Sequence, residues 1–588
     1  MAPAKPATGE ATNARPSTEI DNIENKTTGQ ENVVVAQNDS TLQGLKLAAV
    51  TTGVCFGALM MSLDISIIGT AIPSIMSEFG DTSQIAWYPA AFTFAVCSLT
   101  PLAGKMAAVF PLHLVYMSFS AIFLVGSIVC GCAPTSNAFI AGRAISGVGA
   151  AGVASNGMTI LLTIAPPRRK PVLMGAGAGC FALGLVIAPV LGGALTERVT
   201  WRWCFWINLP FITITIATIF LFYKPTKADR RSVMARILGL DLVGCAVFVP
   251  AIFMLLLALQ TGGERNSWDS ATVIGLFVGF GVLAAVFVAW QWRKGDGAMI
   301  PGNVAMRPTV IFIGMFAFCH MGSLTIAGFY LPEWFQVVEG VNPLESGVRM
   351  LPTVITQIIA TIFASSLALR IKYYNPWFFL APLFMCTAGA LYTQFKAFST
   401  PPSHWIGFQV IQGIGAGFGM QMSSLSVQLE LKDSPEIVPV GIALVMLFQY
   451  LGATVVQVIA GAIFNGELKD QLASHVGLTG PEMEFLLDGG VRNVREVTEQ
   501  HFPELLTPIL EAYNSAITRV FFVPVAGAGA ALIFACGIKW NRIEGGRKSE
   551  TKLEAIEGAE GAESAEAAET VEVASKARGE VDKAGSNP

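Results

Sequence analysis

Charged side chains are scarce in this sequence. Asp, Glu, Lys and Arg make up 13% of its 588 residues, whereas a soluble globular chain carries about 25%. Hydrophobic residues make up 53%, and the mean hydropathy is +0.57. A chain with so few charges cannot cover a soluble surface, so the composition predicts a protein with many membrane spans. The formal net charge of −4 gives no reason to expect a nucleic-acid partner.

Paired cysteines and catalytic motifs are also lacking. The ten cysteines are mostly inside apolar runs, as Cys55, Cys97, Cys180 and Cys386 are, and no two form a C-x-x-C pair. We therefore interpret them as small core residues rather than as a disulfide or metal framework. The sequence has no P-loop lysine motif, no HExxH and no nucleophile elbow in a strand-turn-helix setting, which argues against ATP as the energy source and against an enzyme. We expect no cofactor and no bound metal.

Long apolar runs are what the sequence does contain, between two polar tails. Residues 1–45 and 540–588 have no hydrophobic segment of the signal-peptide kind, so we interpret both as disordered tails. Fourteen apolar runs between them are long enough to cross a hydrocarbon core about 30 Å thick. These runs are 46–72, 84–106, 113–133, 138–163, 171–195, 201–223, 237–259, 271–292, 308–331, 346–369, 377–395, 404–428, 438–463 and 518–539.

Positive charge is concentrated on alternate connections between these runs. The connections at 168–170 and 224–236 are rich in lysine and arginine, whereas the opposite short connections carry only Arg198, Arg202, Arg265 and Lys396. Positively charged loops stay on the cytosolic side, and an even number of spans returns the chain to its starting side, so both tails are predicted to be cytosolic. The long connection at 464–517 then lies outside. Its amphipathic stretch from His501 to Tyr513 predicts a short helix on the outer face, or a capping segment with no substrate role.

An internal repeat relates the fourth run to the twelfth. Residues 143–151, RAISGVGAA, match residues 409–417, QVIQGIGAG, so that Arg143 aligns with Gln409. Repeats of this kind are typical of transporters whose two halves enclose a site. Two six-helix halves alone would separate the matching helices by six spans, whereas eight separate them here. We therefore predict six-helix halves at 46–223 and 308–539, with two additional helices at 237–292 between them.

Small residues form two stripes on the fifth run, which lets two neighbouring helices approach closely in a bilayer, and Pro189 predicts a kink. One stripe is Gly177, Gly184, Ala188 and Gly192, and the other is Gly175, Gly179, Ala182 and Gly193. The spacing Gly175, Gly184, Ala188-Pro189, Gly192-Gly193 resembles the antiporter motif in the fifth helix of major facilitator superfamily drug:proton antiporters, which have Gly in place of Ala188. Trp201 to Pro210 resembles the start of helix six in the fourteen-helix branch. The resemblance covers roughly residues 45–540 and implies an all-α membrane protein with the major facilitator fold and 14 transmembrane helices.

A carboxylate and an arginine fall within the spans at similar depth. At 1.5 Å per residue, Asp64 lies about 13 Å and Arg143 about 8 Å below the outer ends of their helices. A carboxylate inside a membrane must be paired or protonated, which is the minimum that proton coupling needs. The resemblance adds roles: the segment from Leu63 to Pro73 is similar to the helix-one motif, whose Asp takes part in transport. The segment from Gly142 to Gly152 is similar to the helix-four motif, whose Arg is tied to proton transfer. A static ion pair is the alternative interpretation.

Other polar residues in the spans are candidates for the lining of a central cavity. His320 is the imidazole nearest the middle of a span, where it would bind substrate or take up a proton, or else bond a neighbouring helix. The amides of Gln357, Gln412, Gln449 and Asn156 are the remaining candidates. Those that do not line a cavity are expected to form interhelical hydrogen bonds worth about 0.6 kcal/mol each.

These features together predict a transporter that exports a small apolar compound by alternating access in exchange for protons. The resemblance implies a fungal toxin or multidrug efflux pump in the plasma membrane, acting as a monomer, with substrate, protons and membrane lipid as its partners. The nearest alternative is a vacuolar transporter of basic amino acids, or a siderophore transporter, of the same superfamily. Such cargo would require acidic or specifically polar cavity groups, and few carboxylates other than Asp64 are visible in the spans. A membrane receptor that no longer transports is a further alternative.

Overall fold

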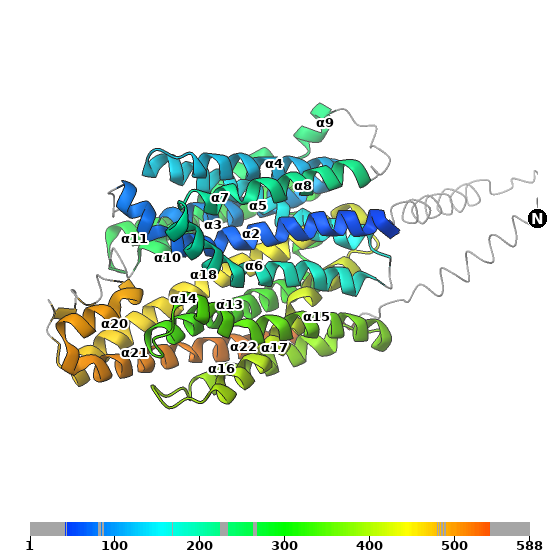
Figure 1. The fold of residues 1–588 in the computed structure, drawn as a ribbon. Coiled ribbons are helices and arrows are strands. Elements are labelled where there is room, and N and C mark those ends of the chain that lie inside the picture. Colours follow the sequence, from blue (N-terminus) through cyan, green and yellow to red (C-terminus); the bar gives the residue numbers. More distant parts are fainter. Residues whose placement is uncertain are drawn as a thin grey trace, which may run out of the picture.

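The computed structural model describes residues 42–540, apart from 43, 80–83, 85–86, 167–168, 224–232, 263–266, 479, 481, 484–485 and 487–489. The predicted tails therefore lie almost wholly outside the described residues. The described chain is helical, and its long helices run side by side along one direction (Figure 1). In Figure 1 they extend between an end at the left, where α20 lies and which we call the α20 end, and an end at the right, where α2 begins and which we call the Gly44 end.

The long helices follow the predicted runs closely. They are α2 (Gly44–Phe79), α3 (Trp87–Val109), α4 (Leu112–Gly131), α5 (Ser136–Ile164), α6 (Lys170–Arg198), α8 (Asn208–Phe222), α10 (Leu242–Thr261), α11 (Ala271–Lys294), α13 (Pro308–Val337), α15 (Leu351–Ile371), α16 (Asn375–Tyr392), α17 (Pro402–Glu430), α18 (Val438–Gln471) and α22 (Phe522–Ala535). Shorter helices are α7 (Trp203–Trp206), α9 (Val233–Leu238), α12 (Gly302–Ala305), α14 (Pro343–Arg349), α20 (Gly490–His501) and α21 (Leu506–Val520).

Twelve helical segments among the described residues are long and apolar enough to cross a membrane. They coincide with twelve of the fourteen predicted runs. The other two runs, 377–395 and 404–428, form helices α16 and α17, which do not reach this standard of length and hydropathy. Gln409, Gln412 and Gln421 make α17 more polar than the other long helices. These side chains are buried within the bundle. The prediction of fourteen spans is therefore not confirmed.

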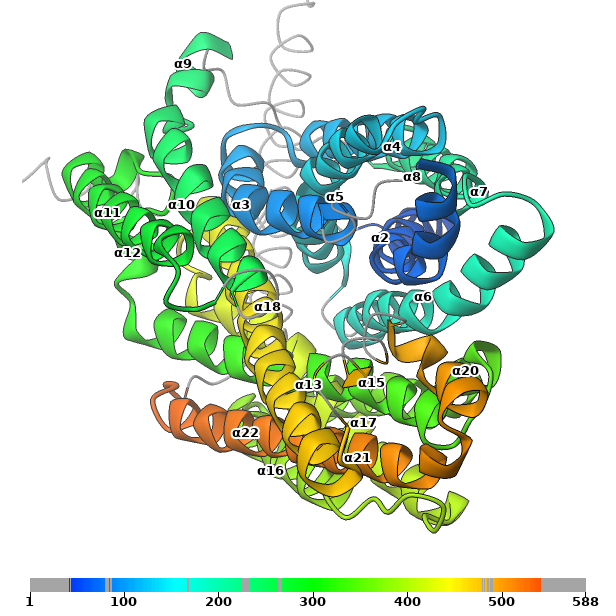
Figure 2. The same cartoon turned by 90° about the vertical axis from the view of Figure 1, so that its left-hand side faces the viewer.

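The helices pack in two groups that meet mainly along two helix pairs. In the first group α2 packs against α6 and α8, and α5 against α3 and α4; in the second, α13 packs against α18 and α22, and α17 against α15 and α16. The groups meet where α3 packs on α18 and α6 on α15. Viewed along the helices, α10 and α11 lie at the edge of the molecule, with α10 beside α3 and α18 (Figure 2).

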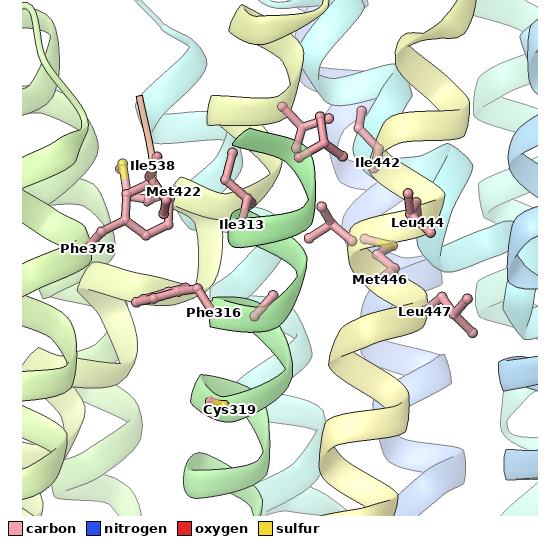
Figure 3. Close-up of a cluster of buried hydrophobic side chains, with 14 of the residues drawn as sticks. Ile313, Phe316, Cys319, Phe378, Met422, Ile442, Leu444, Met446, Leu447 and Ile538 are labelled. Atoms are coloured by element: carbon pink, nitrogen blue, oxygen red, sulfur yellow. The ribbon is translucent and has the colours of Figure 1, made fainter. Parts of the chain in front are cut away.

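The largest buried cluster lies mainly in the second group. It contains Ile313 and Phe316 on α13, Phe378 on α16, Met422 on α17 and Ile442 on α18 (Figure 3). Lipid tails are as apolar as these side chains, so their transfer out of lipid gains little. Close van der Waals packing between helices is what stabilises such a cluster in a bilayer.

The helix pair α10–α11 is fastened at the Gly44 end by one carboxylate. Asp241 is the N-cap of α10, with φ of 53°, and accepts hydrogen bonds from Gly244 N at 3.2 Å, Trp290 Nε1 at 2.8 Å, Gln291 Nε2 at 3.0 Å and Met299 N at 2.8 Å. Burial raises the pKa of Asp241, but the four hydrogen bonds outweigh it and leave the pKa below its ordinary value. Asp241 therefore holds α10 to the end of α11 and to the connection that follows.

The connection at 464–517 contains more helix than the sequence indicates. α18 continues to Gln471, and α21 leads into α22 with only Phe521 between them. The amphipathic stretch expected at the surface is divided by Pro503, because proline interrupts the backbone hydrogen bonding of a helix. One face of α21 is buried in the second group through Ile509, Leu510 and Tyr513, so this helix is part of the packed bundle.

Candidate functional site

A buried ion pair joins α2 to α5 in the first group of helices. Arg143 Nη1 donates to Asp64 Oδ2, and the two side chains are 1% and 0% exposed. The residues are 79 positions apart in the sequence and are brought together because α2 and α5 pack against each other. The two residues that the sequence places at similar depth are thus in direct contact.

The rest of the guanidinium of Arg143 is enclosed by α3 and α7. Its Nε donates to the backbone carbonyl of Tyr88 at 3.0 Å. Its Cζ lies 4.6 Å from the ring centroid of Phe92 and 5.8 Å from that of Phe205, which are cation–π distances. The surroundings supply one carbonyl and two ring faces to the cation, so its position is defined by more than the ion pair.

Asn208 is a third member of this site, and the sequence interpretation assigned it no role. It is fully buried at the first residue of α8, where Nδ2 donates to Asp64 Oδ1 at 3.2 Å and to Ser127 Oγ at 3.1 Å. Its own Oδ1 has no hydrogen-bond partner among the described residues. A lone amide between apolar residues at the start of a span, Ile207-Asn208-Leu209, was the available signal.

Burial makes the two charges of this ion pair depend on each other. Removing two charges from water is costly, and the cost is offset only while both charges remain paired and hydrogen-bonded. If Asp64 takes up a proton, Arg143 loses its counter-charge while it is still buried.

Aromatic side chains separate the ion pair from a polar cleft at the α20 end. Phe139 lies 5.1 Å from Tyr88, 5.6 Å from Trp201 and 5.2 Å from Phe205 between ring centroids, and it is fully buried. The cleft is lined by Glu78, Phe79, Gln84, Pro134, Thr135, Ser136 and Asn137.

Polar contacts fix the rim of this cleft. Arg202 donates to both carboxylate oxygens of Glu78, at 2.7 and 2.8 Å, and Trp201 Nε1 donates to Oε2 at 2.8 Å. These hydrogen bonds, first from Arg202 and then from Trp201, hold the pKa of Glu78 below its ordinary value. On the other wall the hydroxyl of Tyr88 lies 2.9 Å from Ser136 Oγ, which donates to Gln84 Oε1 at 2.8 Å. Tyr88 thus links the two sites: its hydroxyl lies at the cleft, and its backbone carbonyl accepts a hydrogen bond from Arg143.

The glycines of α6 face two different helices. A Cβ atom on Gly184 would lie 2.6 Å from the carbonyl oxygen of Leu59 on α2, and one on Gly192 would lie 2.8 Å from Ile67 Cγ1. A Cβ atom on Gly175 would lie 2.6 Å from Ile362 Cγ1 on α15. One stripe of small residues therefore contacts α2, within the first group, and the other contacts α15, across the two groups.

The remaining residues of this motif, Gly193, Pro189 and Ala188, have surroundings different from those of the three glycines above. A Cβ atom on Gly193 would meet no described atom within 4 Å, so Gly193 is not at a close helix contact. Pro189 lies inside α6, which is assigned as one helix from Lys170 to Arg198. Ala188, the departure from the motif, is fully buried.

His320 and the two buried glutamines lie at contacts between helices of the second group. The ring of His320 stacks on Phe316 at 5.5 Å and lies against Gly419 of α17; neither ring nitrogen makes a hydrogen bond of acceptable geometry to a described residue. Gln357 Nε2 donates to Met420 Sδ at 3.4 Å. Gln412 Oε1 accepts from the hydroxyl of Tyr392 at 2.5 Å. The structure does not bring these three residues together with Asp64.

The last two cavity candidates are also apart from the ion pair. Gln449 is half-buried on α18. Asn156 is fully buried and its amide has no hydrogen-bond partner among the described residues. It follows Gly149 and Gly152 by seven and four residues, and these two glycines contact α4 at Phe123 and Phe119. Residues with this spacing share a helix face, so Asn156 points toward α4.

The residues of the internal repeat occupy corresponding places in the two groups. Gly147 abuts the backbone of Phe92 on α3, and Gly413 abuts the backbone of Thr353 on α15. Gln409, aligned with Arg143, donates to the backbone carbonyl of Arg349 at 2.8 Å. The second group therefore has a neutral amide where the first has a guanidinium. Among the described residues no His, Cys, Asp or Glu cluster has the arrangement of a metal site.

Comparison with known proteins gives consistent matches over most of the chain. Residues 54–456 match the sequence profile of the Major Facilitator Superfamily. The chain is 37% identical over 529 residues to the MFS-type transporter poxA of Penicillium oxalicum, which covers 89% of this chain and 93% of that protein. It is 34% identical over 507 residues to the MFS-type efflux pump MFS1 of Arthroderma benhamiae, with 85% and 93% covered.

A third relative and a solved structure extend this comparison. The rubrofusarin-specific efflux pump aurT of Gibberella zeae is 36% identical over 503 residues, with 85% of this chain and 91% of that protein covered. The crystal structure of the human organic anion transporter MFSD10 aligns with a TM-score of 0.52 at 12% identity, over 84% of this chain and 100% of that one. This structural similarity concerns the fold alone.

Proposed function

Because the chain belongs to the major facilitator superfamily, we propose that it is a proton-coupled efflux transporter for a small, largely apolar compound. Membership of the superfamily makes it a multi-pass membrane transporter. The proton coupling, the direction of transport and the class of cargo are our proposal.

The observation that carries the proposal is the buried pair of Asp64 and Arg143. A membrane-buried carboxylate marks an ion or proton pathway more often than it marks a structural contact. Here Arg143 and Asn208 each donate a hydrogen bond to one oxygen of this carboxylate. Uptake of a proton by Asp64 would release Arg143, and this release would favour the other orientation of the transporter.

The packing of the helices supports alternating access by two halves. We propose that 46–223 and 308–539 are those halves and that 237–292 is an addition, with α16 and α17 also crossing the membrane to give fourteen spans. In support, the most extensive pairs in the first group have counterparts in the second: α2–α6 matches α13–α18, and α4–α5 matches α16–α17. The halves touch mainly along α3–α18 and α6–α15, where they would rock against each other.

The cargo is proposed from the chemistry of the buried surfaces and from the relatives. Asp64 is the one carboxylate among the candidate site residues and is already paired with Arg143, so it leaves little negative charge to bind a basic amino acid. Among the relatives, MFS1 is named an efflux pump and aurT a rubrofusarin-specific one. We propose a fungal secondary metabolite, toxin or drug as cargo and the plasma membrane as the location, with the Gly44 end and both tails in the cytosol.

Vesicles with an imposed pH gradient test this function. Sealed vesicles that contain the protein would be assayed for gradient-driven movement of rubrofusarin and of a set of similar apolar aromatic compounds. Asp64→Asn should abolish gradient-driven movement when transport is compared at equal amounts of folded protein in the vesicles. Asp269→Asn, at an exposed position between α10 and α11, is the matched control and should transport normally. Undiminished transport by Asp64→Asn would overturn the proposed coupling.

A further inference from the structure

A second carboxylate lies within a membrane helix and has no part in the site described above. Glu333 is on α13 and is 9% exposed. The sequence-based span ended at residue 331, just before Pro332, so that Glu333 was placed outside the membrane. The structure continues α13 through Pro332 to Val337, which puts the carboxyl group inside the helix bundle near the α20 end.

The surroundings of Glu333 are apolar and aromatic. It follows Gly322 by eleven residues, which is the same face of α13, and Gly322 contacts Val456 on α18. One turn before it, Tyr330 lies 5.5 Å from Phe464 of α18, and Phe464 lies 6.0 Å from Tyr513 of α21. α13 also contacts α21. The side chain of Glu333 is therefore largely buried where α13 packs against α18 and α21.

No described group compensates a charge on Glu333. Its Oε1 is buried without a hydrogen-bond partner, and no described cation lies within ion-pair distance of the carboxyl group. The arginines on the elements around it are engaged elsewhere: Arg349 with Glu339 and Glu345, Arg495 with Glu499, and Arg519 with Glu467. Tyr513 is the one titratable side chain of α21 that is buried.

We propose that Glu333 is a second proton-binding site, which carries a proton in this conformation and releases it when the contacts of α13 with α18 and α21 open. An ionised carboxylate buried without a partner is far less favourable than the neutral acid, so an enclosed Glu333 is neutral. Asp64, by contrast, has the cation of Arg143 and the amide of Asn208 as partners. The two acids thus lie in opposite surroundings.

The internal repeat explains why the two groups differ. Arg143 of the first group aligns with Gln409 of the second, which bonds to Thr353 and to a backbone carbonyl instead of to an acid. The second group therefore has a carboxyl group on its first helix and a neutral amide at the position that corresponds to Arg143. In the first group, a proton on Asp64 would compete with Arg143 for the carboxylate. In the second group, the apolar surroundings of Glu333 would favour the protonated acid.

This inference rests on the proposed function, but its first test does not require transport. Infrared spectra of the purified full-length protein at neutral pH would be searched for the carbonyl stretch of a buried, protonated carboxylic acid. We expect the band in the unmodified protein, in Asp64→Asn and in the exposed control Glu504→Gln, and its loss in Glu333→Gln. Retention of the band by Glu333→Gln, or its absence from the unmodified protein, would overturn the inference and leave the proposed function untouched.

The second test measures protons moved per molecule of rubrofusarin in proteoliposomes. Glu333→Gln mimics the neutral acid and should still fold and transport, with one proton fewer per substrate than the unmodified protein. Glu333→Asp should restore the original ratio. An unchanged ratio in Glu333→Gln would overturn the second proton site alone. A failure of the unmodified protein to move protons would overturn the proposed function, and the second site with it.

Discussion

Asn208 Nδ2 donates a hydrogen bond of 3.2 Å to Asp64 Oδ1, the carboxylate oxygen that Arg143 does not contact. The acid is thus held by a charged donor on one oxygen and by a neutral donor on the other. The same amide donates to Ser127, so α8 is tied to α2 and α4 at one point. A change in the charge of Asp64 would therefore alter the hydrogen bonds that join α2 to α5 and to α8.

Removal of this amide should move the pH dependence of efflux. Asn208→Ala deletes one hydrogen bond to the ionised carboxylate, and a hydrogen bond to a charged group contributes about 1.5–3 kcal/mol. The ionised carboxylate is then less stabilised, so the pH profile of efflux should shift toward higher pH. Measurement of efflux over a range of external pH values checks this. Thr213→Ala, on the exposed face of α8, should leave the profile in place, and an unmoved profile in Asn208→Ala would contradict the assigned role.

The ion pair predicts a specific pattern of stability in single and double variants. Removal of one partner from a buried pair leaves an uncompensated charge, which costs about 3–5 kcal/mol in soluble proteins. Asp64→Asn and Arg143→Gln should therefore each lower the thermal unfolding temperature of the purified protein. The double variant has no buried charge and should unfold at a higher temperature than the Arg143→Gln variant. Additive losses in the double variant would show that the pair is not coupled.

The sequence alone predicted the positions of the long helices and singled out Asp64 and Arg143. It did not predict which side chains surround this pair. Apolar runs and small-residue spacing gave the positions of the spans, because a bilayer requires that local signal in each helix. Asn208 and Glu333 were missed for two reasons: a single amide carries no information about which helix will face it, and Pro332 appeared to end a helix that continues. The sequence left His320 and Gln412 as candidates for either role, because polarity alone does not distinguish a cavity-lining residue from an interhelical contact.

Two glycines of α6, Gly184 and Gly193, should respond very differently to an added side chain. A Cβ atom on Gly184 would press on the backbone of Leu59 and, at 3.1 Å, on Leu63 N, and a backbone cannot rotate away as a side chain can. Gly184→Val should separate α2 from α6 at a cost of about 1–3 kcal/mol and reduce the yield of folded protein. Gly193→Val, nine residues later, has open space around the new atoms and should express normally. Size-exclusion profiles of both variants provide the measurement, and equal yields would contradict the close contact.

The cap at Asp241 predicts tolerance of mild acid. Its pKa is depressed in the folded protein, so the stability it contributes is fully present above its ordinary value of 3.8 and is lost only as pH falls through the lower folded value. The attachment of α10 to α11 should therefore not change between neutral pH and about pH 4. Asp241→Ala removes the acceptor of four hydrogen bonds and should lower the thermal unfolding temperature equally across that range. A loss that grows toward pH 4 in the unmodified protein would identify a different group as responsible.

Phe139 is expected to act as a barrier to protons between the polar cleft and Asp64. Its ring fills the space between Tyr88, Trp201 and Phe205, so Phe139→Ala would leave a cavity beside the buried pair. Water that enters this cavity would connect the cleft to the carboxylate, and proteoliposomes should then leak protons without substrate. The same substitution in an Asp64→Asn background should not leak, because no acid is left to carry the proton inward. Phe329→Ala, at an exposed position on α13, controls for general loosening of the bundle; a leak that persists without Asp64 would show that protons pass by another route.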